Sequence, residues 1–149
     1  MLWWIISLVI LMYGCDDTKE IIEYYENGNI KSIKKVRICN NKIDTLNVIE
    51  YYDNGKIRCT GEYRNNLKNG KWVYYYSNGN IWSKGNFVNG KSEGKFYVYN
   101  SDGSLFMVSS YKQGVPDGEW LFFENNKIIK TIIFKNGKKI LEKNESNIL

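Results

Sequence analysis

After residue 20, most of the chain consists of short segments in which bulky apolar residues recur at every second position. A period of two is typical of β-strands, whose side chains point alternately to opposite faces of a sheet. Asn-Gly and Asp-Gly pairs interrupt these segments, and they are the strongest short-range signal for a β-hairpin turn. The pattern therefore predicts a chain of consecutive antiparallel hairpins with little helix.

One hairpin sequence is repeated along the chain. YYENGNI begins at Tyr24 and returns as YYDNGKI, YYSNGNI and YNSDGSL, and a fifth copy, FFENNKI, has Asn126 in place of the glycine. We expect a type I′ turn at each tip, because both of its central residues need a positive φ, which Gly and then Asn adopt most easily. The turn glycines are Gly28, Gly55, Gly79 and Gly103.

A second series of turns lies between the copies. It reads NGK from Asn69, NGKSEG from Asn89, QGVPDG from Gln113 and NGK from Asn136. Each unit therefore has two strands and two turns, and neighbouring hairpins are expected to pair edge to edge. The fold class that follows is all-β, with tandem antiparallel β-hairpins forming one elongated, twisted sheet.

The tip of the third unit predicts the register of its two strands. It places Tyr76 opposite Ile81, Tyr74 opposite Ser83, and Trp72 opposite Gly85, where a large ring can cover a glycine. These residues share one face with Phe87. The other face is expected to carry Val73, Tyr75, Trp82 and Lys84, and the same rule adds Tyr97, Tyr99, Phe106 and Val108 from the fourth unit.

Aromatic residues of this second face form a candidate binding surface, because exposed aromatic side chains are favoured anchors at interfaces. The alternative is that they only hold neighbouring hairpins together, which is the ordinary role of aromatic cross-strand pairs. The candidate binding residues are Tyr24, Tyr51, Tyr75, Trp82, Tyr99 and Phe106.

The segment from Gly70 to Gly90 resembles the MORN repeat (membrane occupation and recognition nexus), in the variant form common in bacteria. The resemblance extends over five units, residues 21–141, and leaves a polar tail at 142–149. It implies a non-enzymatic binding protein. Bacterial proteins with this variant are often named YwqK-family antitoxins, which implies direct binding to a toxin, whereas the MORN name itself implies a phospholipid-binding scaffold.

The first fifteen residues carry no charged side chain, and their apolar run is too short to span a bilayer as a helix. The run ends in Gly14-Cys15 and resembles a bacterial lipoprotein signal, which implies a signal peptide at 1–14 and lipidation of Cys15. Residues 15–20 then form a polar tether to a cell-envelope membrane. The alternatives are an uncleaved anchor and a buried apolar strand.

The remaining composition argues against catalysis. The chain has no His, which removes the commonest general base, and Cys39 and Cys59 have no CxxC partner. We therefore expect no enzyme activity, no cofactor and no metal site, and two free thiols, since strand alternation places these cysteines on opposite faces. The net charge of +5 invites a nucleic-acid partner. Its lysines, however, are spread over every unit, so we expect a protein partner or an envelope component and no nucleic acid.

Overall fold

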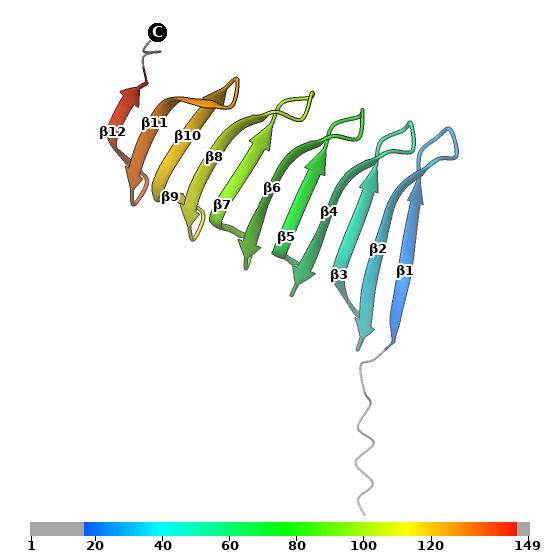
Figure 1. The fold of residues 1–149 in the computed structure, drawn as a ribbon. Coiled ribbons are helices and arrows are strands. Elements are labelled where there is room, and N and C mark those ends of the chain that lie inside the picture. The colour runs from blue at the N-terminus through cyan, green and yellow to red at the C-terminus, as the bar shows by residue number, and fades with distance from the viewer. Residues whose placement is uncertain (1–16, 146–149) are drawn as a thin grey trace, which may run out of the picture.

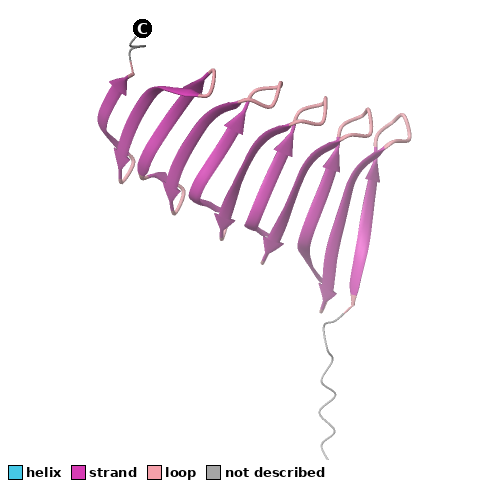
Figure 2. Cartoon of the chain, in the orientation of Figure 1, coloured by secondary structure: helices cyan, strands magenta, loops and turns pink. Residues whose placement is uncertain are grey.

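The computed structural model describes residues 17–145, and these form one open, twisted sheet of twelve strands and no helix (Figures 1 and 2). Strands that follow one another in the chain are neighbours in the sheet, and every pair is antiparallel. The two-residue strand β9 pairs only with β8, and β10 is the strand that follows β8 in the sheet order. The strands are β1 (Thr18–Tyr24), β2 (Ile30–Cys39), β3 (Lys42–Tyr51), β4 (Ile57–Arg64), β5 (Leu67–Tyr75), β6 (Ile81–Val88), β7 (Lys91–Tyr99), β8 (Leu105–Lys112), β9 (Val115–Pro116), β10 (Gly118–Glu124), β11 (Lys127–Lys135) and β12 (Lys138–Asn144). The expected all-β hairpin array is confirmed.

The sheet has two faces, which we name after adjacent residues of β5. One row of directly paired residues crosses the whole sheet on the Val73 face: Ile22, Ile33, Ile49, Thr60, Val73, Lys84, Tyr97, Val108, Leu121, Thr131 and Lys143. The neighbouring row lies on the Trp72 face, because successive side chains alternate. It contains Glu23, Ser32, Glu50, Cys59, Tyr74, Ser83, Val98, Met107, Phe122 and Lys130.

The first four tips differ from the expected type I′ turn. At the third tip, the N–H of Gly79 donates to the carbonyl of Tyr76 (2.9 Å), and the N–H of Tyr76 donates to the carbonyl of Asn80 (2.8 Å). Gly79 has a φ of 99°, but Asn78 is not among the residues with positive φ. This is a three-residue loop, in which a type I turn is followed by a left-handed glycine. The expected turn type is therefore wrong at Gly28, Gly55, Gly79 and Gly103, although each has the positive φ that was predicted.

This loop adds a β-bulge beside the tip, and the bulge changes the register. Trp72 faces Gly85 and Tyr74 faces Ser83, as predicted, but Tyr75 rather than Tyr76 faces Ile81. The fifth tip has no such loop. There Asn125 and Asn126 have φ values of 49° and 61°, as a type I′ turn requires.

The second turn series is displaced in its first member. The turn lies at Asn65-Asn66, both with positive φ, whereas Gly70 lies inside β5 at a register shift. Asn89-Gly90 does form a turn with two positive φ values. Gly94 then lies inside β7 at a register shift, in the position that Gly70 has in β5. In three units a two-residue turn is thus followed by a glycine with positive φ, namely Gly70, Gly94 or Gly118.

Most of the deeply buried side chains lie on the Trp72 face. The ring of Trp72 is 2% exposed and packs with Val48 and Cys59. From there a line of ring contacts, with centroids 4.9–6.2 Å apart, runs across the strands. It consists of Tyr63, Trp72, Phe87, Phe96, Tyr111, Trp120 and Phe134. Within residues 17–145, no helix is long and apolar enough to cross a membrane.

Candidate binding surfaces

The four tyrosines of the candidate surface lie at equivalent positions on the Val73 face. Tyr75, for example, is the strand residue next to Tyr74, which belongs to the Trp72 face. Tyr24 is 60% exposed, whereas the other three are partly buried. The nitrogen of Lys84 lies 5.3 Å from the ring centroid of Tyr99. The tyrosine part of the surface therefore exists as a stripe, which consists of Tyr24, Tyr51, Tyr75 and Tyr99.

The other two residues lie on the opposite face, so the expected grouping of six is wrong. The ring centroid of Trp82 is 6.1 Å from that of Tyr74 and 6.3 Å from that of Tyr76. The Phe106 ring lies 6.2 Å from that of Phe122, which is in the Trp72-face row. The cause is the tip bulge, because its extra residue breaks the simple alternation of side chains.

A hydrogen-bonded ladder runs along the tyrosine stripe and uses the backbone carbonyls of three of its members, not their rings. The second tyrosine of each YY pair donates its hydroxyl to the carbonyl of the stripe tyrosine in the next unit. The donor–acceptor pairs are Tyr25 to Tyr51 (2.7 Å), Tyr52 to Tyr75 (2.7 Å) and Tyr76 to Tyr99 (2.9 Å). Asn100 occupies the next donor position, and its amide instead bonds the hydroxyl of Ser104 within its own tip. The hydroxyls of Tyr25, Tyr52 and Tyr76 thus help to hold the first four units in register.

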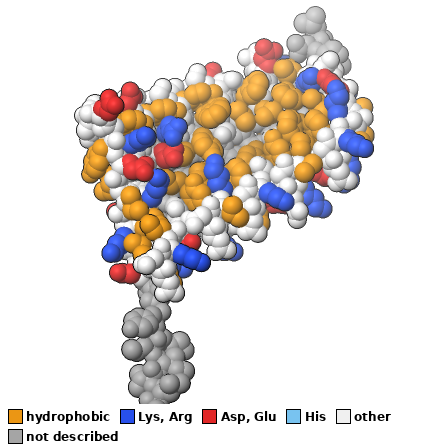
Figure 3. All heavy atoms as spheres, turned by 180° about the vertical axis from the view of Figure 1, so that it is seen from behind, with side chains coloured by type: hydrophobic (Ala, Val, Ile, Leu, Met, Phe, Trp, Pro, Cys, Tyr) orange, Lys and Arg blue, Asp and Glu red, His pale blue; other side chains and the backbone are white. Residues whose placement is uncertain are grey.

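The Trp72 face carries the more exposed aromatic side chains of the sheet interior. Trp82 is 48% exposed and Phe106 is 42% exposed. Around them lie the apolar residues Val98, Met107 and Phe122. Figure 3 shows this face, with hydrophobic side chains gathered most densely toward the C-terminal strands. We name Trp82, Val98, Phe106, Met107 and Phe122 the aromatic patch.

The N-terminal part of the same face is charged instead. Glu23 accepts hydrogen bonds from Lys34 (2.9 Å) and from Ser32 (2.7 Å), and these contacts lower the pKa of its carboxyl. Arg58 donates to Glu50 (2.5 Å). The face therefore divides into a paired-charge half over β1–β4 and an apolar half over β6–β10.

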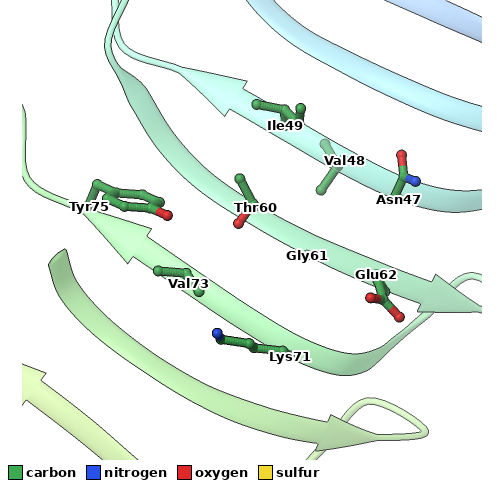
Figure 4. A pocket seen from close by; sticks show the side chains of 9 residues that line it. All are labelled: Asn47, Val48, Ile49, Thr60, Gly61, Glu62, Lys71, Val73 and Tyr75. Atoms are coloured by element: carbon green, nitrogen blue, oxygen red, sulfur yellow. The ribbon is translucent and has the colours of Figure 1, made fainter. Parts of the chain in front are cut away.

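An open hollow lies on the Val73 face over β3–β5 (Figure 4). Ile49, Thr60 and Val73 form its floor in one paired row. The polar groups of Glu62 and Lys71 lie at one end. The remaining lining residues are Asn47, Val48, Gly61 and Tyr75. Within residues 17–145, no group of three or more acidic, His or Cys side chains is placed to hold a metal ion.

The two cysteines of the sheet differ from the expected pair of free thiols. Cys59 is free and buried; burial, followed by a hydrogen bond to Glu50, raises its pKa to about 12. It is therefore a neutral thiol with no nucleophilic character at physiological pH. Cys39 has a bonding partner, so the expectation of a free thiol is wrong there.

Basic side chains are distributed over both faces. Lys71 and Lys84 lie on the Val73 face, whereas Lys34 and Arg58 lie on the Trp72 face. Lys68 is partly buried on the Trp72 face, and its nitrogen lies 4.1 Å from the Trp72 ring centroid. No single basic surface forms among the described residues.

Comparison with known proteins supports the resemblance in the N-terminal half of the sheet. The model of the MORN repeat variant matches residues 18–35, 45–65 and 68–89. Each matched segment contains one of the first three tip loops. The comparison with curated proteins found no match. The lipidated cysteine expected at position 15 lies outside the described residues. Residues 18–89 of this chain are similar to the MORN repeat variant, and the described sheet of tandem antiparallel hairpins is consistent with such repeats.

Proposed function

We propose that this chain is a membrane-anchored, extracytoplasmic protein without catalytic activity, which binds a protein partner. MORN-type repeats are generally involved in binding to proteins or membranes, which supports the class of function. A single-layer sheet also presents both of its faces to solvent, so its binding area is large for its length.

The observation that carries this proposal is the aromatic patch. A soluble sheet gains nothing from leaving Trp82 and Phe106 nearly half exposed, and exposed aromatic clusters of this kind mark interaction sites. On the other face, the rings of Tyr51, Tyr75 and Tyr99 are partly buried, and of the stripe only Tyr24, on the edge strand, is exposed. We therefore assign partner binding to the Trp72 face, over β6–β10.

The test is affinity capture from envelope extracts with the full chain as bait. We expect the double variant Trp82→Ala and Phe106→Ala to lose a partner that the parent chain retains. Tyr24→Ala is the matched control, since it removes an even more exposed aromatic ring, which lies on the Val73 face. If Tyr24→Ala lost the partner and the double variant kept it, the partner would bind the Val73 face, which would contradict the proposal.

Membrane attachment is proposed to occur through lipid on Cys15. Stable anchoring requires more than one acyl chain, and a lipoprotein cysteine typically carries several. The intact mass of the membrane-extracted protein should show loss of residues 1–14 and added acyl mass. A Cys15→Ala chain that is still processed and retained in the membrane would contradict this anchor.

A toxin is one possible class of protein partner, as the resemblance to YwqK-family antitoxins implies. It would be recognised by the same aromatic patch, so the double variant should also lose protection against that toxin. Phospholipid binding by the sheet has less support, because the basic side chains do not share one face.

A further inference from the structure

The first strand of the sheet is an unprotected edge. All seven residues of β1 are exposed, and they include the large apolar side chains of Ile21, Ile22 and Tyr24. Exposed strand edges present unpaired N–H and C=O groups that can add another strand. The opposite edge, β12, is also fully exposed, but it carries three lysines, a common device against edge pairing.

The hydrogen-bonding direction of β1 is known from its start. The carbonyl of Asp17 accepts from the N–H of Ile38 on β2 (3.3 Å), so the odd-numbered residues direct their backbone groups inward. The even-numbered residues Thr18, Glu20 and Ile22 therefore direct theirs away from the sheet. A second antiparallel strand would bond to these residues.

The sequence of β1 is complementary to itself in that arrangement. In an antiparallel pair centred on Ile21, all seven residues overlap, and Lys19 of each copy lies opposite Glu23 of the other. Ile21 meets its own copy at the centre, in a non-hydrogen-bonded position, where side chains are closest. These three residues lie on the Trp72 face. The same operation on β12 would place Lys139 opposite Lys143.

Glu23 is able to accept this additional contact. Its two carboxylate oxygens receive one hydrogen bond each, from Lys34 and from Ser32. An ionised carboxylate has about four acceptor sites. No bond of the described residues engages the side chain of Lys19, which is exposed. The ion pair between copies therefore displaces no contact seen within one chain.

We propose that two copies of this chain associate through β1, as an antiparallel two-fold pair that joins their sheets into one. The two-fold symmetry makes the contact self-limiting, because each copy uses its only β1 edge. The partner surface on β6–β10 remains uncovered in both copies. The inference is independent of the proposed binding partner and of its identity.

The test measures the oligomeric state of the full chain in mild detergent by sedimentation equilibrium. We expect a concentration-dependent dimer for the parent and for Lys19→Arg, and at least a tenfold larger dissociation constant for Lys19→Glu, which opposes two acidic side chains. Lys138→Glu, on the exposed β12 edge, is the matched control and should leave the dissociation constant unchanged.

A cross-link tests the register separately. Facing residues in a non-hydrogen-bonded antiparallel pair have Cα atoms about 4.5 Å apart, within disulfide range. Ile21→Cys should therefore form a disulfide-linked dimer under mild oxidation, beyond the level of the parent chain, whereas Leu141→Cys on β12 should not. A monomeric parent chain, a dimer insensitive to Lys19→Glu, or equal cross-linking of both variants would overturn the proposal.

Discussion

At the residue scale, the tightest packing occurs where aromatic rings cover glycines. A Cβ on Gly61 would lie 2.2 Å from the Trp72 ring, and one on Gly85 would lie 2.2 Å from the Phe96 ring. The ring that covers each glycine thus comes from the following unit. Trp72 was expected to cover Gly85, which it faces in the register, but its ring covers Gly61 instead. These rings therefore cover part of the sheet's backbone, which has no second layer of structure to cover it.

Gly85→Ala should therefore lower the free energy of unfolding by about 1–3 kcal/mol, which is the usual cost of overpacking. Urea denaturation would measure the change. In a Phe96→Leu background the added methyl has more room, so its cost should shrink. An equal cost in both backgrounds would show that the ring is not the obstacle.

The tip glycines are constrained by their backbone rather than by space. A Cβ on Gly79 would meet only Lys56 at 4.0 Å, but its φ is 99°. We expect Gly79→Val to lower the free energy of unfolding by more than the ~1–2 kcal/mol that left-handed geometry costs an ordinary residue, because it is β-branched. Gly79→Asn should cost less in the same urea melts, since Asn tolerates positive φ. A Val variant that melted with the parent would contradict the left-handed assignment.

At the element scale, the hairpins were predictable from sequence and the bulges were not. Alternation and repeated Asn-Gly pairs were sufficient to predict the strands and the Trp72–Gly85 register. Both loop types use Asn and Gly, however, and they differ in the number of loop residues and in the φ of the residue before the glycine, such as Asn78. One bulge residue per tip then moved Trp82 to the other face. A face assignment therefore fails wherever a bulge lies between the turn and the residue.

The turns between hairpins are docked by the residue that precedes each bulge glycine. Asp117 accepts from the N–H of Asn136 (2.9 Å), and Glu93 accepts from that of Gln113 (2.8 Å) in the preceding unit. The hydrogen bond from Asn136 lowers the pKa of Asp117, with a further contribution from Lys135. The sequence marked Asp117 and Glu93 only as part of a turn, because the N–H group that donates to each lies one unit away.

This contact predicts a pH-dependent contribution to stability. A carboxyl whose folded pKa is lowered stabilises the fold above its unfolded value near 4 and loses that contribution as the pH falls through the folded value. Asp117→Ala should therefore have a lower urea midpoint than the parent at neutral pH, and the difference should vanish in strong acid. Glu124→Ala, an exposed acidic residue at a tip, is the control. A difference that persisted in acid would exclude the carboxylate as its source.

At the scale of the whole molecule, stability depends on neighbours along one direction. Each strand contacts only the strands on either side, so the central strands are supported twice and the edge strands β1 and β12 once. In such a linear array, stability is close to a sum of unit and interface contributions. Native-state hydrogen exchange should therefore be slowest in the backbone amides of β4–β7 and fastest in the edge strands.

Trp72→Ala tests how far this coupling extends. Removing a buried Trp costs about 3–5 kcal/mol. Its ring contacts Tyr63 on β4 and Phe87 on β6, and its indole N–H donates to the carbonyl of Glu62 (3.0 Å). Hydrogen exchange should therefore accelerate in β4–β6 and, more weakly, in the units beyond them. Phe134→Ala, at the end of the same line of rings, should accelerate exchange only in β10–β12. Uniform acceleration over the sheet in both variants would mean that the array unfolds as one unit, and the neighbour-by-neighbour description of its stability would be wrong.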